Sequence, residues 1–475
     1  MQQEQNCTDT NWTPTLDGRP GPRYRAIAGA LAADVADGTL PPGTRLPTHR
    51  ELARRLGVTV GTVSRAYAEA ARRGVIDATV GRGSFVRGGH AAGEAVPAAI
   101  PALAEPGSEG TDQLDLSTNA PAREPVHAAL RELADAAARA GAWATAADYH
   151  TATGTGAQRE AGARWLTRTG LDVAADEIVP VAGAQTGQAL ALGRLASPGD
   201  AVLLAELTWP MVKEALRLHG LRGEPVGMDA EGIRPDALAD ACRRTGARVL
   251  FTMPTLNNPT TATMGEDRRR ELLAVARDHG LTVVEDDIYG FLHAGRHTPL
   301  AALDRERVVH VTSLAKAVAP GVRAGFVVPP PWLHRSLVGA VRAAMLMTPP
   351  LDLEWARLAV ETGIAARGAT AQRSEAAARQ ALLRRHLGHL GPQSDDAALH
   401  AWLSLPEEWT TAGFTHAAAG RGVVLTPGDA FAVAGDPGAV RVCLGPAPSR
   451  AALTRALRAV AELMAAPPSA ADPVV

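Results

Sequence analysis

Lys316 is the first residue whose type and surroundings suggest covalent chemistry. It lies in HVTSLAKAVAPGVRAGF, after an apolar run that ends at Val311, and it is flanked by the hydroxyl of Ser313 and the guanidinium of Arg323, as a phosphate-binding pair would flank it. A lysine amine attacks a carbonyl only when deprotonated, so a Schiff-base lysine needs surroundings that lower its pKa. A Ser-x-x-Lys spacing alone occurs by chance in many helices. Lys213, in VKEALRLHG, is predicted to be an ordinary solvated helix lysine.

Two residues after another apolar run suggest what Lys316 would bind. Asp286 and Tyr289 end the segment LTVVEDDIYG. The acid would keep a pyridine nitrogen protonated, and the phenol would donate to a ring oxygen. Pyridoxal phosphate (PLP) needs such partners because its protonated ring is the electron sink.

Three further segments offer groups for the same cofactor. Gly183, Ala184 and Gln185 follow an apolar strand and begin a predicted helix, so their backbone N–H groups would cradle a phosphate. Trp209 offers a flat face for stacking, and Asn258 would reach a ring oxygen. Taken singly, a tryptophan is more often simply buried, and an Asn-Pro pair indicates only a turn.

The N-terminal region has a different pattern, with three short amphipathic helices. Apolar spacing predicts helices over 24–36, from the cap Thr48 to Gly57, and from the cap Thr59 to Gly74. Only two residues separate the second and third helices, which is the tight connection of a helix-turn-helix. A two-stranded hairpin with a basic tip follows, and this combination would place one helix in a major groove with a wing beside it. The alternative is a small helical domain whose surface arginines are merely solvated.

The predicted DNA contacts lie at the start of the third helix, near the second helix and on the hairpin tip. They are Arg45, Arg50, Thr59, Val60, Thr62, Arg65, Gly81, Arg82 and Gly83. The stretch LPPGTRLPTHRELARRLGVTVGTVSRAYAEAARRGVI, followed by GRGSFV, resembles the GntR-type winged helix over about residues 20–87. The resemblance implies a bacterial transcription regulator whose Arg50, Thr62 and wing glycines face DNA. Relatives usually carry arginine where this chain has Val60, which offers only an apolar contact.

Composition and charge agree with this division. The chain has 475 residues, 46% of them hydrophobic and 21% charged, which is ordinary globular composition. Residues 1–87 carry a net charge of +4 and the remainder −6, so a basic module precedes an acidic body. Three scattered cysteines argue against a disulfide framework and a metal site. We find no membrane-length apolar stretch and no signal peptide, so a cytoplasmic location is expected.

Beyond residue 112 the pattern predicts an α/β domain. Residues 88–112, rich in Ala, Pro and Gly, are predicted to form a flexible linker. Apolar runs then alternate with helical stretches at 177–181, 201–205, 248–252, 281–285, 308–312 and 324–328. They indicate a largely parallel sheet covered on both faces. Shorter strands near 398–405, 422–426 and 440–444 and a last helix predict a smaller C-terminal α+β subdomain.

Residues 113–465 resemble fold-type I, class I aminotransferases in the order and content of these segments. The resemblance implies that Arg441, in VRVCLG, binds the carboxylate of an amino acid, for which a forked guanidinium is suited. It implies that Tyr149 reaches the phosphate of the neighbouring subunit. Relatives commonly end the asparagine motif in glycine, whereas this chain has Thr261.

A GntR winged helix joined to an aminotransferase-like domain is the arrangement of MocR-type regulators. The predicted domains are the winged helix at 17–87, the linker at 88–112, the PLP-binding effector domain at 113–465 and a disordered tail at 466–475. The resemblance implies a homodimer that binds double-stranded DNA and in which an amine, an amino acid or a B6 vitamer is the signal, forming an aldimine at Lys316. Two alternatives stay open: an active PLP-dependent aminotransferase with an accessory DNA-binding module, and a PLP-free scaffold that retains the fold.

Overall fold

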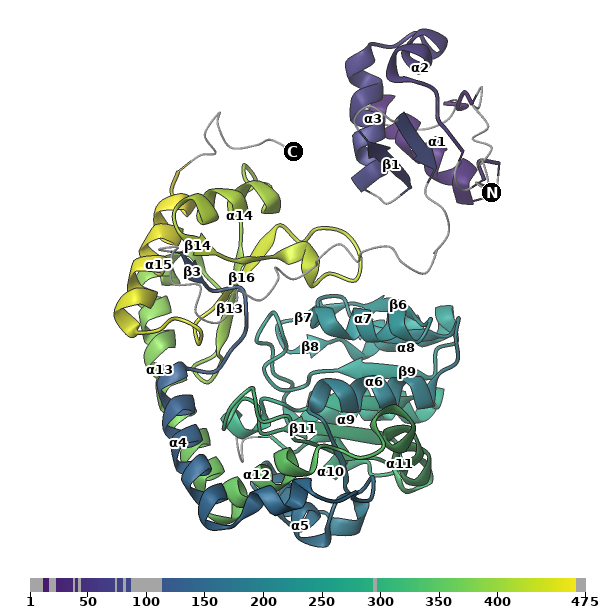
Figure 1. The fold of residues 1–475 in the computed structure, drawn as a ribbon. Coiled ribbons are helices and arrows are strands. Elements are labelled where there is room, and N and C mark those ends of the chain that lie inside the picture. Colours follow the sequence, from purple (N-terminus) through teal and green to yellow (C-terminus); the bar gives the residue numbers. More distant parts are fainter. Residues whose placement is uncertain are drawn as a thin grey trace, which may run out of the picture. The chain divides into compact units, whose positions relative to one another are not determined.

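The computed structural model describes residues 12–16, 23–36, 39–41, 44–72, 75–79, 83–86, 113–293 and 297–466 (Figure 1). The chain divides into two compact units, Met1–Pro97 and Ala98–Val475. The predicted linker and the tail beyond Ala466 lie outside the described residues. Within the described part of the chain, no helix combines the length and the apolar character needed to cross a bilayer.

The first unit is a small helical domain with a hairpin. Its elements are α1 (Arg23–Ala36), α2 (His49–Leu56), α3 (Val60–Arg72), β1 (Ile76–Thr79) and β2 (Gly83–Val86). Thr48 caps α2 in a capping box with Glu51, as the sequence predicts, and Gly57 ends the helix in the left-handed conformation, at φ 63°. β1 and β2 pair in antiparallel register, Ile76 opposite Val86.

The core of this unit is built from residues of all three helices. Ile27 of α1, Leu52 of α2 and Val63 of α3 are fully buried together. Trp12 lies in the same core, five residues before the predicted start of the domain, and its Nε1 donates to Asp34 Oδ2 at 2.7 Å. The predicted boundaries at 17, 87, 113 and 465 stay predictions.

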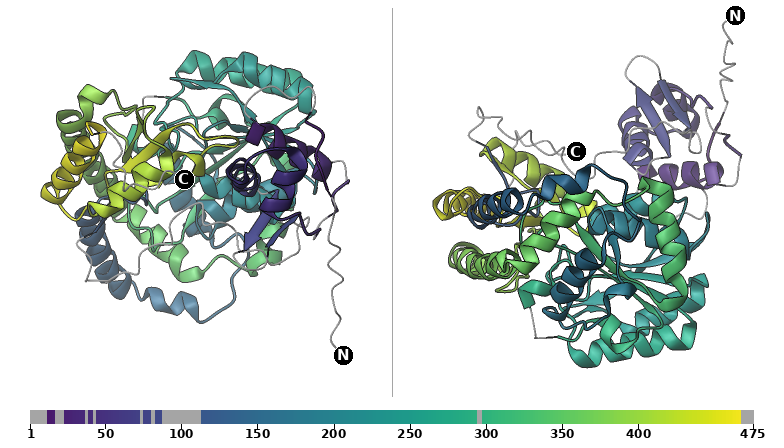
Figure 2. Two further views of the ribbon diagram at one scale, coloured as in Figure 1. Left: turned by 90° about the horizontal axis from the view of Figure 1, so that it is seen from above. Right: turned by 60° about the horizontal axis from the view of Figure 1, so that its bottom comes forward.

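The second unit is centred on a seven-stranded sheet in the order β4-β12-β11-β10-β9-β5-β6. The strands are β4 (Val179–Val181), β5 (Ala201–Ala205), β6 (Arg222–Val226), β9 (Val249–Thr252), β10 (Thr282–Asp286), β11 (Val308–Ser313) and β12 (Gly325–Val328). The run from β11 to β6 is parallel, and β12 pairs antiparallel with both of its neighbours. Helices cover both faces of this sheet (Figure 1, Figure 2), which explains why its central strands are apolar throughout.

The helices around the sheet and the subdomain differ widely in length. The α-helices are α4 (Arg123–Arg139), α5 (Gly156–Thr167), α6 (Ala184–Leu195), α7 (Pro210–Leu218), α8 (Pro235–Thr245), α9 (Glu266–His279), α10 (Leu300–Leu303), α11 (Pro331–Met345), α12 (Pro350–Glu361), α13 (Ile364–Leu387), α14 (Thr411–Gly420) and α15 (Arg450–Met464). Short 3-10 turns lie at Ala142–Ala146, Ala175–Glu177, Gly290–His293, Gly388–Leu390 and Gly428–Ala430, and β7 (Met228–Asp229) pairs with β8 (Gly232–Ile233).

A smaller subdomain brings the two ends of the second unit together. Strands β13 (His400–Ser404), β16 (Ala439–Cys443) and β15 (Thr426–Pro427) form an antiparallel sheet. β14 (Val423–Val424) pairs in parallel with β3 (Leu114–Asp115). The N–H of Cys443 donates to the carbonyl of Leu116 at 3.0 Å, so residues 114–119 lie beside β16 although more than 300 residues separate them in sequence.

All six apolar runs predicted as strands form strands of the large sheet. β6, RGEPV, is not predicted from the sequence, because only Val226 is buried in this edge strand and the strand therefore has no apolar run. Thr261 has φ 62°, in the left-handed region where a β-branched residue is strained and glycine is not. This conformation explains why glycine suits the position.

Candidate functional site

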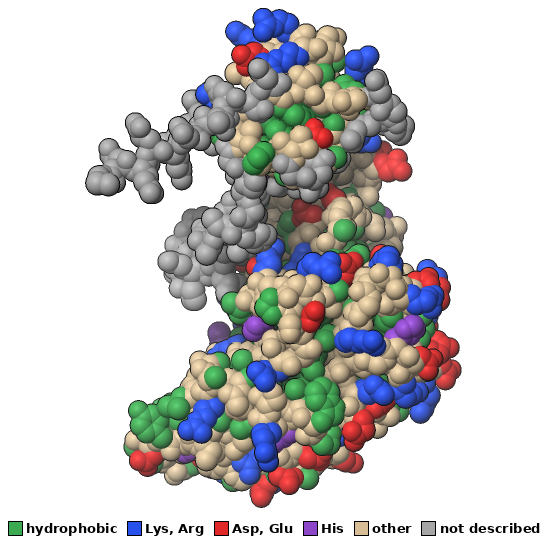
Figure 3. All heavy atoms as spheres, turned by 90° about the vertical axis from the view of Figure 1, so that its right-hand side faces the viewer, with side chains coloured by type: hydrophobic (Ala, Val, Ile, Leu, Met, Phe, Trp, Pro, Cys, Tyr) green, Lys and Arg blue, Asp and Glu red, His purple; other side chains and the backbone are tan. Residues whose placement is uncertain are grey.

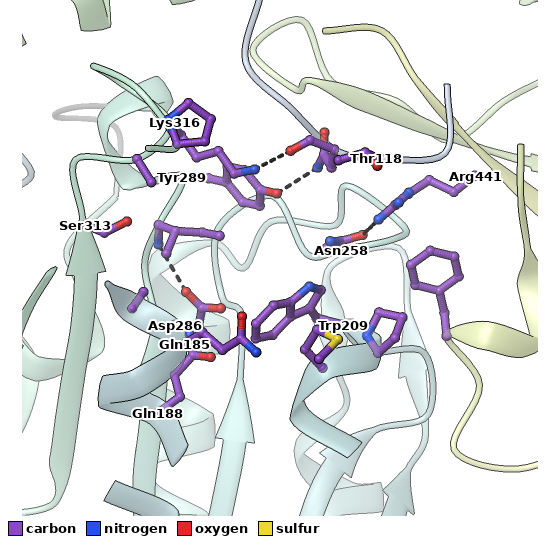
Figure 4. A pocket seen from close by; sticks show the side chains of 18 of the residues that line it. Thr118, Gln185, Gln188, Trp209, Asn258, Asp286, Tyr289, Ser313, Lys316 and Arg441 are labelled. Carbon is purple, nitrogen blue, oxygen red and sulfur yellow. Dashed lines mark hydrogen bonds between the residues drawn. The ribbon is translucent and has the colours of Figure 1, made fainter. Parts of the chain in front are cut away.

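A pocket of about 480 Å³ lies at the carboxyl ends of the parallel strands, between the sheet and the smaller subdomain (Figure 4). Ligands of open α/β sheets commonly bind at this edge. Ten of the residues singled out in the sequence line it: Ala184, Gln185, Trp209, Asn258, Asp286, Tyr289, Ser313, Lys316, Arg323 and Arg441.

One end of the pocket lies at the start of α6, where Ala184 and Gln185 line it. Gly183, at φ 83°, leads from β4 into α6, and a Cβ placed on it would lie 2.5 Å from Nη2 of Arg323. A Cβ on Gly325 would meet Ala184 N at 2.9 Å. The Arg323 guanidinium therefore packs against the backbone at the start of α6, where the first N–H groups of the helix have no partner within the helix. Ser313 lines the same pocket. This arrangement suits an anion at a helix N-terminus.

Lys316 projects into the middle of the pocket, three residues after β11 (Figure 4). Its Nζ donates to the backbone carbonyl of Asn119. Burial lowers the pKa of the Lys316 amine to about 8, with the positive charges of Arg441 and Arg323 acting in the same direction. A substantial fraction of the amine is therefore neutral near pH 8, as a nucleophilic lysine requires.

Asp286 ends β10 below the pocket, with only 1% of its surface exposed. Its Oδ1 accepts from the N–H of Ile288 at 3.2 Å, and its Oδ2 has no partner within hydrogen-bond geometry among the described residues, although the side chain of Gln188 lies close enough to lower the pKa of the carboxyl. Burial raises the pKa of Asp286 to about 7. A buried carboxylate oxygen without a partner is costly, so the site suits a ligand that brings a donor to this oxygen.

Tyr289 is held by Asn119, which in turn contacts His400, and neither of these two residues was predicted from the sequence. Asn119 Nδ2 donates to the Tyr289 hydroxyl at 2.7 Å and lies 2.9 Å from Nδ1 of His400. Burial lowers the pKa of His400 to about 3, so its ring is neutral and Nδ1 accepts. Since Asn119 already donates to the phenol oxygen, the Tyr289 proton is free for a ligand. Asn119 lies in an irregular segment whose spacing carries no signal.

Arg441, a residue of β16, closes the end of the pocket opposite the start of α6. Its Nη1 donates to Asn258 Oδ1 at 2.9 Å, and its Nη2 donates to the carbonyl of Ser117. The guanidinium carbon lies 4.6 Å from the ring centre of Phe431, a cation–π contact. These contacts hold the guanidinium fork in place, and Arg441 is 95% buried. This geometry suits one carboxylate.

Trp209 is half-buried at the start of α7 and lines the same pocket (Figure 4). Tyr149 does not line it. Tyr149 is 84% exposed, beside a separate hollow lined by Val338, Arg342 and Leu346. Its predicted role toward a neighbouring subunit stays a prediction.

The first unit presents its predicted DNA contacts around the start of α3. Arg50, Thr59 and Arg65 are exposed. Val60 is 45% exposed, and Thr62 is half-buried with its hydroxyl 2.9 Å from that of Thr59. Basic side chains gather at the end of this unit drawn uppermost in Figure 3.

The remaining predicted contacts are Arg45, Gly81, Arg82 and Gly83. Arg45 is half-buried and its backbone bridges to Phe85 of β2. Gly83 begins β2, while Gly81 and Arg82 lie outside the described residues. Arg23 and Tyr24 of α1, which the sequence analysis did not single out as contacts, line a hollow with Thr59 and Arg65.

The pocket around Lys316 fits PLP on three independent features. Asp286 has a buried oxygen that lacks a partner within hydrogen-bond geometry, Gly183 lets the Arg323 guanidinium pack at the start of α6, and Lys316 offers an amine whose pKa is lowered. These features match the ring nitrogen, the phosphate and the aldehyde of the cofactor.

Comparisons with known proteins agree with both units. Residues 23–86 match the gntR family of bacterial regulatory proteins, and residues 111–460 match aminotransferase class I and II. The uncharacterized HTH-type transcriptional regulator YdeF of Bacillus subtilis is 27% identical over 89% of this chain and 90% of its own length. The uncharacterized HTH-type transcriptional regulator YdcR of Escherichia coli is 27% identical over 86% of this chain and 92% of its own length.

Solved structures match the second unit. LysN, an α-aminoadipate aminotransferase from Thermus thermophilus, is 26% identical with a TM-score of 0.68, covering 74% of this chain and 92% of its own. An archaeal alanine:glyoxylate aminotransferase is 25% identical, with a TM-score of 0.69. The larger unit therefore has the fold-type I aminotransferase architecture with a mostly parallel sheet. The chain belongs to the aminotransferase class I and II family and joins that domain to a gntR-family helix-turn-helix, which is the MocR-type arrangement.

Proposed function

We propose that this protein is a transcription regulator that binds PLP at Lys316 and whose binding to double-stranded DNA changes when an amine or amino acid enters the same pocket. The observation that carries the proposal is the presence, in one chain, of a gntR-family domain and of a pocket with a complete set of groups for PLP. Relatives with both domains are named HTH-type transcriptional regulators, which supports the same function.

Each part of the pocket has a separate task in this proposal. Lys316 would hold the cofactor, Asp286 would keep a proton at the ring nitrogen, and Tyr289 would donate its hydroxyl proton to the ring oxygen. The N–H groups of α6 and Arg323 would bind the phosphate. When bound, PLP would supply an aldehyde that reacts with primary amines and a protonated ring that acts as an electron sink.

The effector would be recognised at its carboxylate by Arg441. The other anion-binding groups of the pocket, Arg323 and the N–H groups of α6, would already be occupied by the phosphate of the cofactor. Displacement of the Lys316 amine would then change the pocket and favour a different arrangement of the DNA-binding units. An effector can shift that equilibrium only through its different affinity for the two arrangements.

A homodimer is part of the proposal. Tyr149 and Leu346, 84% and 50% exposed, lie around one hollow of the second unit. Large apolar side chains gathered at one site are typical of an interface. Two basic units held by one dimer would read two half-sites at a fixed spacing.

The test uses the full chain and the DNA immediately upstream of its own coding sequence. The protein is loaded with PLP, its absorbance is recorded, and DNA affinity is titrated with and without a panel of amino acids and amines. We expect the wild type to gain the absorbance of bound PLP and to change its DNA affinity with at least one effector.

The matched variant is Lys316→Ala. It should lose the absorbance and the response to amines, while DNA affinity without effector stays within about twofold because the first unit is untouched. A variant that still responds to the same amines would refute the role of Lys316. A wild-type protein that takes up no PLP would support the scaffold alternative.

A second candidate function is an active aminotransferase, which the presence of Asp286, Tyr289, Lys316, Arg323 and Arg441 in one pocket favours. Supplying amino acid and 2-oxo acid pairs to the loaded protein separates the two. Sustained 2-oxo acid release at about 1 per second or faster would identify an enzyme. A spectral change that is not followed by turnover supports the regulator.

A further inference from the structure

Lys213 differs from its predicted role as a solvated helix lysine. It is half-buried on α7, and its Nζ donates to the backbone carbonyl of Ala432 at 2.8 Å. The chain has 48 basic residues and only two of them are lysines, Lys213 and Lys316. A lysine ammonium is a compact donor that fits where the planar fork of arginine would not. A lysine at this position is therefore suited to the single carbonyl that it contacts.

Ala432 belongs to the segment Gly428–Val433, which joins β15 to the loop before β16. Three consecutive residues of this segment are attached to residues 206–213, the stretch that leads from β5 into α7. The N–H of Thr208 donates to the Phe431 carbonyl at 3.0 Å, and the N–H of Val433 donates to the Glu206 carbonyl at 2.9 Å. Lys213 supplies the bond to the residue between them.

Of these three hydrogen bonds, the one from Lys213 is donated by a side chain, and its acceptor is buried. Ala432 is only 7% exposed, so without Lys213 its carbonyl would be left without that donor in a place of limited access to water. An unsatisfied buried carbonyl is costly, and the segment would relieve that cost by moving away from α7. The segment itself has little freedom at its start, because a Cβ on Gly428 would lie 2.5 Å from the carbonyl of Ala439.

The segment carries Phe431 into the carboxylate end of the pocket. Phe431 is fully buried, lies edge-on to Trp402 with ring centres 5.8 Å apart, and packs under the guanidinium of Arg441. The position of the Arg441 fork thus depends on Phe431 from one side and on Asn258 from the other.

We propose that Lys213 is a positioning residue for the carboxylate site: by fastening Ala432 to α7 it holds Phe431 against Arg441, and it thereby favours effectors that carry a carboxylate over amines that do not. This inference rests on the proposed function, because it concerns the effector end of the same pocket. It assigns to Lys213 no contact with the cofactor or the effector.

The test compares Lys213→Met with Arg217→Met in the full chain. Methionine keeps the length of the lysine stem and removes its donor. Arg217 lies one turn later on α7, is exposed and pairs with Glu214, so its replacement removes one positive charge from the same helix without touching the segment.

The first measurement is amide hydrogen exchange of the peptide covering residues 428–435, in protein without PLP. We expect at least threefold faster exchange in Lys213→Met and no change in Arg217→Met. The second measurement uses PLP-loaded protein and compares half-saturation by alanine with that by ethylamine, read from the cofactor absorbance. Alanine should bind about 5- to 20-fold more weakly to Lys213→Met, while ethylamine stays within twofold.

Unchanged exchange in Lys213→Met would overturn the proposal, as would equal weakening of alanine and ethylamine. A general loss of folding would accelerate exchange throughout the second unit, so peptides of β10 and β11 serve as internal references. If wild-type protein takes up no PLP, the proposed function fails, while the exchange measurement still decides whether Lys213 holds the segment.

Discussion

Arg50 and Arg441 are the same residue type in opposite surroundings in the two units. Arg50 is exposed on α2, and Arg441 is 5% exposed on β16. Solvated charges are screened by salt and recognise an extended anion through many modest contacts. A buried guanidinium fixed by neighbours recognises one small anion through a few strong hydrogen bonds. The first unit is therefore suited to a polymer and the second to a small molecule.

Replacing the buried arginine should have the largest effect. Arg441→Met removes the charged donors of the carboxylate site, so affinity for alanine should fall about 10- to 100-fold. Affinity for ethylamine, which has no carboxylate, should change little. Both are read from the absorbance of PLP-loaded protein. An equal loss for both ligands would mean that Arg441 serves the fold of the pocket and not recognition.

The pH dependence of PLP uptake should distinguish the buried amine from an exposed one. The pKa of Lys316 is lowered to about 8, so its neutral form predominates above pH 8 and falls about tenfold per pH unit below it. The rate of covalent uptake should rise from pH 6 to 8 and level above that. Butylamine in solution is the control, since its reaction should keep rising to higher pH. A profile like that of butylamine would show that the pocket does not tune Lys316.

Replacing the exposed arginine should have a smaller and less specific effect. Arg50→Ala should weaken DNA binding several-fold for all sequences and lower the salt slope by about one unit, because one phosphate contact is lost. Arg421→Ala is the control, since Arg421 is an exposed arginine of the second unit, 3.7 Å from Glu462. A slope that Arg50→Ala leaves unchanged would show that α2 faces away from DNA.

The smallest effect is expected at Val60, which offers only an apolar contact. Val60→Ala should change discrimination at a single base position by about fivefold or less, and leave the salt slope as it is. Binding to a set of single-base variants of the upstream DNA measures this. A loss spread evenly over all positions would place Val60 in the packing of the unit.

Local patterns in the sequence were sufficient to predict the capping box of α2, six strands of the large sheet and the site residues at the ends of β10 and β11. Thr48 and Glu51 have the spacing of a capping box and form one, and the six apolar runs form strands. Asp286, Ser313 and Lys316 lie at or just after the ends of strands β10 and β11, and the carboxyl ends of neighbouring parallel strands meet at one edge of a sheet. Their assembly follows from the order of strands.

Other site residues have no local signal. Asn119 and His400 are 281 residues apart, yet their side chains meet, and Asn119 donates to the hydroxyl of Tyr289. Phe431 reads as an ordinary core residue, and Lys213 as an ordinary helix lysine. Their roles arise from the docking of the smaller subdomain against the large sheet, an arrangement that spacing along the chain does not encode.

The amino-acid sequence by itself determined which chemical groups are present and which lie at strand ends or helix starts, because such features depend on neighbours a few residues away. Only the tertiary structure decided how deeply each group is buried and which distant segments enclose it. Burial and enclosure set the lowered pKa of Lys316, the unpaired oxygen of Asp286 and the fixed fork of Arg441. They depend on packing between distant parts of the chain.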